Sequence, residues 1–254
     1  MSADTAGEVL SHVEGQVATL TLSRPGKHNS LTRAMWRQLT ELVRELDDDP
    51  QIRVITVRGK GSVFSSGADL PEVIEAAGAR ESAQAFCEEV AAALVALATS
   101  SKLTVALLAR HVSGGGAEIA MACDLRLAQD DILFSIPVAR MGLVPDRLTV
   151  RRLLSLAGPG TARAILLLAR RLDAEHCLRV GLVDQIVPVG DLDEALHAVL
   201  RDLSDTVDYS VTNTKALLLR EEALTNGDLV EEFVESLVSG GVAQNGARHL
   251  AGLR

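Results

Sequence analysis

The sequence predicts an α/β fold in which short, mostly parallel strands alternate with helices, followed by a helical region at the C-terminus. Short apolar runs such as 54–57 and 103–109 alternate with stretches of helical periodicity through the first half of the chain. After Gly158 the pattern becomes almost wholly helical and is interrupted only around residues 184–187. We therefore expect an α/β core over residues 1–190 and a helical region over residues 191–254.

The N-terminal elements are a predicted hairpin and a predicted helix. Residues 8–22 alternate around Glu14 and Gly15, which is typical of two antiparallel strands joined by a tight turn. Thr32 then caps a helix whose apolar residues recur at helical spacing. The run 47–50, Asp-Asp-Asp-Pro, ends that helix.

The middle of the chain continues the alternation. A buried strand at 54–57 leads into a Ser-Ser-Gly-Ala-Asp turn at 65–69, and an alanine-rich helix follows at 82–98. The strand at 103–109 precedes a glycine-rich turn and a helix. Two further short strands are predicted at 125–128 and 132–134.

The C-terminal helices are predicted from their apolar periodicity. They cover residues 161–171, 174–180, 192–203, 211–224 and 229–238. The region from 191 onward is too small and too apolar on one face to stand alone. It should therefore pack on its own core or on another subunit.

The glycine turn, Ser-Gly-Gly-Gly-Ala-Glu at 113–118, is the centre of the predicted site. A glycine-rich turn at a helix start presents free backbone N–H groups, with the positive end of the helix dipole behind them. Such a turn can hold negative charge on an oxygen, and Glu118 lies one turn into the helix. It is not a phosphate loop, because no Lys-Ser/Thr follows and the GxGxxG spacing is absent. On this stretch alone, a plain tight turn with a first-turn acid explains the pattern equally well.

A second stretch favours the functional interpretation. Val-Phe-Ser-Ser-Gly-Ala-Asp-Leu at 63–70, together with the glycine turn, resembles the crotonase superfamily, the enoyl-CoA hydratase/isomerase group. The Arg-Pro…Asn-Ser-Leu turn at 24–31 and Gly-Leu-Val-Asp-Gln-Ile-Val-Pro at 181–188 extend the resemblance over most of the chain. It implies a crotonase-like spiral of ββα units, with residues 191–254 as the oligomerisation region.

The resemblance also implies site residues. The backbone amides of Ala68 and Gly115 would form an oxyanion hole for a thioester enolate, and Glu118 would be the acid/base. Coenzyme A would bind as part of the substrate, with no separate cofactor and no metal. The residues that match the substrate-binding and CoA-binding positions are Lys27, His28, Asn29, Ser66, Asp69, Leu70, Gly114 and Val138. Lys27 and His28 are alternatively solvated turn residues.

The main departure from the family pattern concerns the second acid. The family's Phe-x-x-Pro-Glu turn is here Phe-Ser-Ile-Pro-Val at 134–138, and Val138 cannot transfer a proton. In the next loop Arg147 and Leu148 replace glycines. The position of Asp146 resembles one where some family members, the dienoyl-CoA isomerases and the chlorobenzoyl-CoA dehalogenases, carry a working Asp. Asp146 is therefore either a second catalytic carboxylate or the cap of the helix beginning near Leu148.

Two smaller departures remain. At 109–113 the usual Asn-Gly is replaced, which brings in His111 as either a proton shuttle or a structural residue. The family's lysine-rich C-terminal tail is absent, so Arg248 or Arg254 would have to contact the CoA phosphates.

Together these residues predict an acyl-CoA-processing lyase or isomerase that stabilises a thioester enolate and is not an efficient plain hydratase. Several such reactions need fewer proton-transfer groups than hydration does, because the enolate is the shared step. The alternative is a non-catalytic acyl-CoA-binding protein on the crotonase fold. Val138 and the filled loop at 146–148 favour that alternative, whereas Glu118 beside the glycines argues against it.

Composition limits the partners. The net charge of −9 argues against nucleic acid as a partner. The sequence contains no run of eighteen apolar residues, so we expect no membrane insertion. Three scattered cysteines, Cys87, Cys123 and Cys177, are typical of reduced core thiols in the cytoplasm, and no Cys/His spacing suits a metal. The resemblance implies a homotrimer or a dimer of trimers.

Overall fold

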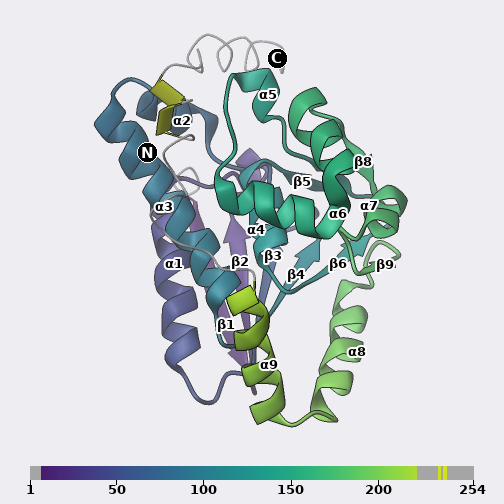
Figure 1. Cartoon of the computed structure of the whole chain (residues 1–254). Coiled ribbons are helices and arrows are strands. Elements are labelled where there is room, and N and C mark those ends of the chain that lie inside the picture. Colours follow the sequence, from purple (N-terminus) through teal and green to yellow (C-terminus); the bar gives the residue numbers. More distant parts are fainter. Residues whose placement is uncertain (1–6, 222–233, 236, 239–254) are drawn as a thin grey trace.

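The main sheet of the structure contains six strands and confirms the mixed α/β class. A computed structural model describes residues 7–221 together with 234, 235, 237 and 238 (Figure 1). The strand order is β1-β2-β3-β4-β6-β9, and every neighbouring pair after the first hairpin is parallel. The strands are β1 (Glu8–Glu14), β2 (Val17–Ser23), β3 (Val54–Gly59), β4 (Leu103–Leu108), β6 (Leu125–Gln129) and β9 (Gln185–Val187).

A second, smaller sheet supports the loops that follow the main sheet. It consists of β5 (His111–Ser113), β7 (Leu133–Ser135) and β8 (Leu172–Asp173), in the order β5-β7-β8. The sequence analysis missed β5 and β8. Both strands are too short to show an alternation, and they exist because β7 pairs with each of them.

The two faces of the main sheet belong to two apolar clusters. Ile55, Ala106 and Ala128 point into the larger cluster, whereas their neighbours Val105 and Leu127 belong to the smaller one. Successive side chains of a strand point to opposite faces, so the clusters lie on opposite sides of the sheet. The larger cluster lies beneath α1 (Arg33–Asp48) and α3 (Arg80–Thr99), and the smaller beneath α8 (Leu192–Ser204) (Figure 1).

Helix boundaries follow the predicted signals at several points. The Thr32 side chain accepts a hydrogen bond from Met35 N and so caps α1, as expected. Helix α3 is long and apolar enough, by composition alone, to cross a membrane, but half of that stretch is buried within the protein. Its buried residues, including Phe86, Val90 and Leu94, pack in the larger apolar cluster, which is the environment of a core helix.

Helix α6 (Arg147–Leu168) is longer than predicted. The sequence suggested separate helical segments on either side of Gly158. The structure joins them across a kink, where Gly158 has φ 70° and Pro159 follows. The remaining α-helices in the described part of the chain are α2 (Leu70–Ala76), α4 (Gly115–Ala122), α5 (Val138–Met141), α7 (Ala174–Val180) and α9 (Asp208–Glu221). The short α2 and α5 were not predicted.

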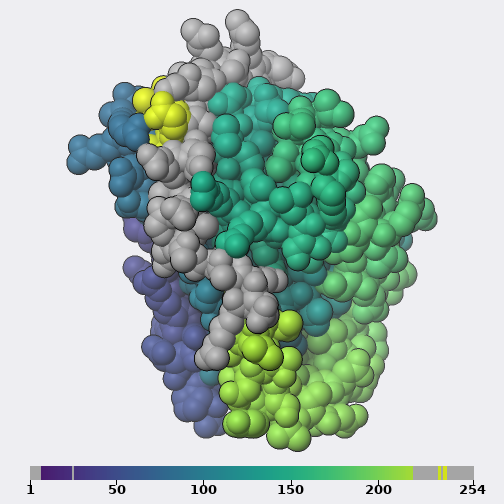
Figure 2. Space-filling view, in the orientation of Figure 1, coloured from purple at the N-terminus to yellow at the C-terminus, as the bar shows by residue number. Residues whose placement is uncertain are grey.

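The C-terminal helices pack on the chain's own core. Leu192, Ala195 and Leu196 of α8 are buried against the main sheet. In α9 the buried Lys215 Nζ donates to Lys102 O and to Asp124 Oδ2, each at 2.6 Å. Figures 1 and 2 show α8 and α9 at the lower end of the molecule. The predicted helix at 229–238 falls mostly outside the described residues, and a boundary at residue 190 stays a prediction.

Candidate active site

Two turns, 65–68 and 113–115, lie side by side above the main sheet. Ser65 N donates to His111 O at 3.0 Å, and Ser113 N donates back to Ser65 O at 3.0 Å. The buried Ser65 Oγ also donates to Asn29 O at 2.8 Å and accepts from Gly67 N at 3.0 Å. These bonds fix the position of each turn relative to the other.

Glycine is required where the two turns meet. A Cβ on Gly67, which has φ 98°, would lie 2.8 Å from Ser113 O and 2.9 Å from Gly115 N. A Cβ on Gly115 would lie 2.7 Å from Trp36 Cζ2 and 3.4 Å from Ala68 N. Only a chain without side chains at these two positions can bring the segments this close.

The backbone amides of Ala68 and Gly115 are therefore neighbours. Within the described residues, neither N–H donates a hydrogen bond to a protein acceptor. Gly115 is the first residue of α4, where helix geometry leaves the N–H groups unpaired and the helix dipole is positive. Two free donors in one place are the arrangement that stabilises an oxyanion.

The two amides open onto a cavity of about 90 Å³. Its walls come from α1 to α5, the 65–68 turn and the segment before α6, and most of the side chains are apolar. The lining residues are Trp36, Ser66, Ala68, Val73, Phe86, Val90, Gly114, Gly115, Glu118, Pro137, Val138, Met141, Leu143 and Pro145. Among them Glu118 is the one ionisable residue.

Glu118 lies in the first turn of α4 and is half-buried. No side chain among the described residues donates a hydrogen bond to its carboxyl group. Burial raises the pKa of Glu118 to about 8, and the nearby Asp146 carboxylate contributes in the same direction. The carboxyl group is therefore mostly protonated at neutral pH and can donate a proton into the cavity.

Asp146 is the N-cap of α6, which is one of the two roles predicted for it. Its Oδ1 accepts from Thr149 N at 2.9 Å and its Oδ2 accepts from Thr149 Oγ1 at 2.6 Å. The side chain is buried, and burial raises its pKa, while the bonds from Thr149 oppose that shift. Asp146 does not line the cavity, yet its charge reaches Glu118. A direct part in proton transfer stays a prediction.

Val138, the first residue of α5, lines the cavity and is buried. Its side chain has no group that can exchange a proton. The wall formed by α5 and the following loop is otherwise made of Pro137, Met141 and Leu143. None of these four side chains can activate a water molecule for attack.

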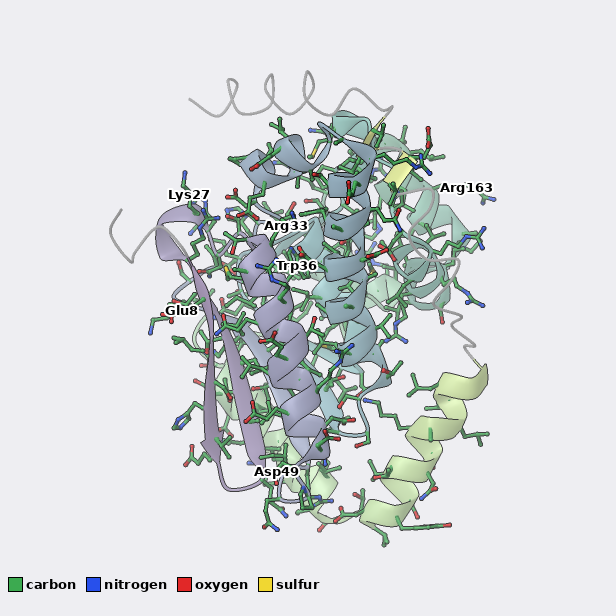
Figure 3. The ribbon with its side chains drawn as sticks, turned by 90° about the vertical axis from the view of Figure 1, so that its left-hand side faces the viewer. Glu8, Lys27, Arg33, Trp36, Asp49 and Arg163 are labelled. Carbon is green, nitrogen blue, oxygen red and sulfur yellow. The ribbon has the colours of Figure 1, made fainter. Side chains whose placement is uncertain are left out.

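The residues expected at the coenzyme end have mixed surroundings. Lys27 and His28 are exposed, and Figure 3 shows Lys27 at the margin of the molecule. Asn29 is buried, and its Nδ2 donates to Lys60 O at 3.0 Å and Val63 O at 2.7 Å. Its Oδ1 accepts from Arg24 N at 3.0 Å, so the side chain holds the turn together.

Asp69 and Leu70 lie at the start of α2, and their expected backbone contacts to the coenzyme stay a prediction. The buried Asp69 carboxylate accepts from the Arg24 guanidinium at 2.6 Å, which leaves it bound within the protein. Leu70 begins α2, and Asp69 precedes it as the N-cap residue. Ser66 and Gly114, both predicted to bind the substrate, line the cavity.

Two features of the site were missed by the sequence analysis. The helical pattern predicts Trp36 as an apolar residue of α1, where Figure 3 labels it. Its fully buried indole lies against Gly115 and lines the cavity. The rings of His28 and His111 also meet edge to face, with centroids 6.2 Å apart. The helical pattern placed Trp36 inward, but only tertiary packing determined what it touches.

The three cysteines are core residues. Cys87, Cys123 and Cys177 are buried free thiols, as predicted. Among the described residues, no group of three His, Cys, Asp or Glu side chains is placed to hold a metal ion.

The chain is similar to known proteins over most of its length. The family model described as enoyl-CoA hydratase/isomerase matches residues 12–231. "Probable enoyl-CoA hydratase echA8" of Mycobacterium tuberculosis is 32% identical over 225 residues, which are 88% of this chain and 86% of that protein. Ethylmalonyl-CoA decarboxylase of Bos taurus is 34% identical over 224 residues, which are 84% of this chain and 73% of that protein.

Solved structures agree with these sequence matches. An enoyl-CoA hydratase/isomerase from Xanthobacter autotrophicus Py2 has a TM-score of 0.83 and 26% identity, covering 97% of this chain and 94% of that one. An enoyl-CoA hydratase from Bacillus halodurans has the same fold, with a TM-score of 0.84 and 24% identity over 94% of this chain and 99% of that one.

Proposed function

The chain belongs to the enoyl-CoA hydratase/isomerase family, and on that basis we propose that it stabilises the enolate of an acyl-CoA thioester between the amides of Ala68 and Gly115. It is an acyl-CoA-processing enzyme of that family. The observation that carries the finer proposal is the pair of free amides facing a cavity in which Glu118 is the one ionisable residue among the described lining residues. The thioester oxygen accepts both N–H bonds, and these bonds strengthen as it becomes negative.

In this proposal Glu118 delivers a proton to the α-carbon of the enolate. Its raised pKa, about 8, keeps that proton on the carboxyl group at neutral pH. The enolate's electron pair takes the proton, the oxyanion returns to a carbonyl, and Glu118 is left as a carboxylate that regains a proton from solvent. Reactions in which the enolate arises by loss of a group other than a proton fit this starting state best.

Loss of carbon dioxide from a malonyl-type thioester is such a reaction. The C–C bond breaks, its electron pair forms the enolate, and no base is needed. The similarity to the Bos taurus protein named ethylmalonyl-CoA decarboxylase supports this class. Isomerisation of an enoyl-CoA needs Glu118 first as a base, and hydration also needs a group that activates water, which Val138 cannot supply.

Asp146 acts in this proposal as a fixed charge. Thr149 donates to both of its carboxylate oxygens, so proton exchange with a substrate would break the cap of α6. Its negative charge instead disfavours ionisation of Glu118. Asp146 is thus a positioning residue that helps to keep the proton on Glu118.

The test is product analysis with a panel of thioesters: saturated, 2-enoyl, 3-enoyl, dienoyl and malonyl types. Mass spectrometry reads the products, and binding of each thioester is measured in parallel for the wild type, Glu118→Gln and Asp146→Asn. Turnover that is lost in Glu118→Gln while binding persists supports the proposal. Binding without turnover of any thioester by the wild type contradicts it and leaves the non-catalytic acyl-CoA binder.

We also propose a homotrimer or a dimer of trimers, located in the cytoplasm. Large apolar side chains are exposed on α6 and α9, among them Leu167, Leu168 and Leu218, and a second subunit would cover them. The three buried free thiols support a reducing compartment. Light scattering after size-exclusion chromatography tests the assembly, and a monomeric mass contradicts it.

A further inference from the structure

The indole N–H of Trp36 is a buried donor without an acceptor. Trp36 is fully buried, and no atom of the described residues accepts a hydrogen bond from its Nε1. Buried tryptophan N–H groups usually find a partner, because leaving a buried donor unpaired is costly. Leucine or phenylalanine would fill an apolar position of α1 without that cost. The unpaired donor therefore needs an explanation other than packing.

A second unpaired atom in the described part of the chain, Arg126 Nε, is of a different kind. Another nitrogen of the same guanidinium, Nη1, donates to Cys123 O at 2.8 Å, and Nη2 lies 2.8 Å from a carboxylate oxygen of Asp184. The Arg126 side chain thus has protein partners. The Trp36 side chain has one polar atom, and that atom has none.

The unpaired N–H lies beside the proposed oxyanion hole. Trp36 lines the cavity together with Gly115 and Glu118. The edge of the indole that faces Gly115 carries Cζ2, because a Cβ built on Gly115 would lie 2.7 Å from that atom. Nε1 and Cζ2 are bonded to the same ring carbon, Cε2, and their hydrogens project from the same edge of the ring. The N–H is therefore on the edge of the indole next to Gly115.

The other hydrogen-bonding groups of the cavity are already committed. In the proposed function the two oxyanion amides hold the thioester oxygen. Ser66 Oγ donates to Lys27 O at 3.3 Å. Apart from Glu118, the remaining side chains among the described lining residues are apolar. Trp36 Nε1 is thus the neutral donor left for a polar group of the acyl chain.

Geometry and volume restrict where that polar group can be. The thioester oxygen would lie at the amide of Gly115, and the β-carbon of the acyl group is two bonds from the thioester carbon. The cavity has a volume of about 90 Å³. Since a cavity of about 150 Å³ holds benzene, this one has room for roughly four non-hydrogen atoms. A short acyl group with an oxygen on its β-carbon fits both limits.

The charge of the cavity favours a carboxylate that is to be lost. The described lining residues include no lysine, arginine or histidine. A cation would stabilise a substrate carboxylate most before its C–C bond breaks, and that stabilisation would be lost as the charge moves to the enolate. A neutral N–H orients the carboxylate with less of this loss. The same carboxylate would disfavour ionisation of Glu118 and so keep its proton in place.

We infer that Trp36 is a specificity-determining residue whose indole N–H donates to an oxygen on the β-carbon of the acyl group, and that this oxygen belongs to the carboxylate of a malonyl-type thioester. The inference rests on the proposed function, which places the thioester oxygen at the amides of Ala68 and Gly115. In the reaction the bond between the α-carbon and the carboxylate breaks, its electron pair forms the enolate, and carbon dioxide leaves. Glu118 supplies the proton to the α-carbon, and Trp36 keeps its own.

The composition of the chain makes the donor directly observable. Trp36 is the single tryptophan, so the protein has one indole N–H resonance in a proton–nitrogen correlation spectrum. Acetoacetyl-CoA and butyryl-CoA are the probes, because they have the same number of acyl carbons, differ in the β-oxygen and carry no carboxylate that could be lost. The indole proton should move downfield with acetoacetyl-CoA, because a new hydrogen bond deshields it. With butyryl-CoA it should stay close to its unliganded position.

Dissociation constants test the same contact. The wild type should bind acetoacetyl-CoA more tightly than butyryl-CoA, and Trp36→Phe should reduce this preference by about tenfold, the factor expected for one hydrogen bond. The value of kcat/KM for malonyl-CoA should fall by a similar factor. Val73→Ala is the matched control, because it widens the cavity without changing a polar atom and should leave the preference as in the wild type.

Other results would overturn the inference. An indole resonance that moves equally with both probes, or a preference that survives in Trp36→Phe, would remove the role of Trp36 while turnover by Glu118 could persist. The wild-type spectra decide the question if Trp36→Phe does not fold. A shift with acetoacetyl-CoA without decarboxylation of malonyl-CoA would overturn the assignment to a carboxylate. If no thioester binds, the proposed function fails and this inference fails with it.

Discussion

The carboxyl groups of Glu118 and Asp146 are electrostatically coupled, although only Glu118 lines the cavity. Burial is the main cause that raises the pKa of Glu118, and Asp146 adds to it. Thr149 holds Asp146 in place through both carboxylate oxygens. The helix cap of α6 therefore also influences the protonation of the acid in the cavity.

Asp146→Asn should move the pH profile of activity. Glu118 is proposed to work in its protonated form, so kcat/KM falls as pH rises through about 8. Without the Asp146 charge, the pKa of Glu118 drops and this fall begins at lower pH. Asparagine still accepts from Thr149 N, so the helix stays capped. Thr149→Ser keeps the hydroxyl that donates to Asp146 Oδ2, and therefore the Asp146 charge, and serves as the control. An unchanged alkaline limb in Asp146→Asn would refute the coupling.

Glu118→Gln should lower turnover by roughly 10² to 10⁴-fold while thioester binding persists. It should also change stability in a pH-dependent way. Because the folded pKa is raised from 4.5 to about 8, folding favours the protonated group, and wild-type stability falls as pH rises through that window. Glutamine removes this loss, so the variant should be more stable than the wild type at pH 9, on the order of 2 kcal/mol, and similar at pH 4. Denaturant titrations at the two pH values measure the difference.

Gly115→Ala should impair both packing and catalysis. The new Cβ would lie 2.7 Å from Trp36 Cζ2, so the indole or the turn must shift, at a cost of about 1–3 kcal/mol in the free energy of unfolding. The displaced amide should lower kcat by about 10² or more. Gly160→Ala in α6, where a Cβ meets nothing within 4 Å, is the control. Adding Trp36→Leu to Gly115→Ala should recover part of the stability, and no recovery would show that the ring contact is not the cause.

Asn29 should prove structural. Glycine at this position can adopt the native φ of 53°, so Asn29→Gly does not strain the backbone. The change leaves Lys60 O and Val63 O without the side-chain donor. We expect a loss of about 2–3 kcal/mol in the free energy of unfolding, because buried carbonyls lose their partners. The affinity of the folded protein for acyl-CoA should change little. A large loss of affinity at unchanged stability would instead assign Asn29 to the ligand.

Val138→Glu should introduce hydratase activity. The glutamate would enter the cavity from α5 and supply the missing proton-transfer group. Hydration of a 2-enoyl-CoA should then rise by roughly 10²-fold, the lower end of what a general acid–base group contributes. Val138→Gln has nearly the same size without the acid and is the control. Equal rates in the two variants would show that the acid at this position is not what limits hydration.

The sequence by itself determined the succession of elements and the chemical character of the site. The hairpin, α1 with its Thr32 cap and the parallel strands follow from period-two and helical patterns, which depend only on local order along the chain. The family was also predictable, because the two turns that carry Ala68 and Gly115 are contiguous motifs.

Tertiary structure decided what those patterns leave open. The strands β5 and β8 exist only because β7 pairs with them, and Trp36 becomes part of the cavity only because α1 packs against the start of α4. Coordinates were also needed to show that Asp146 caps α6 through Thr149 and that its charge influences Glu118. A pKa depends on burial and on charges distant in sequence, and neither is a property of the local chain.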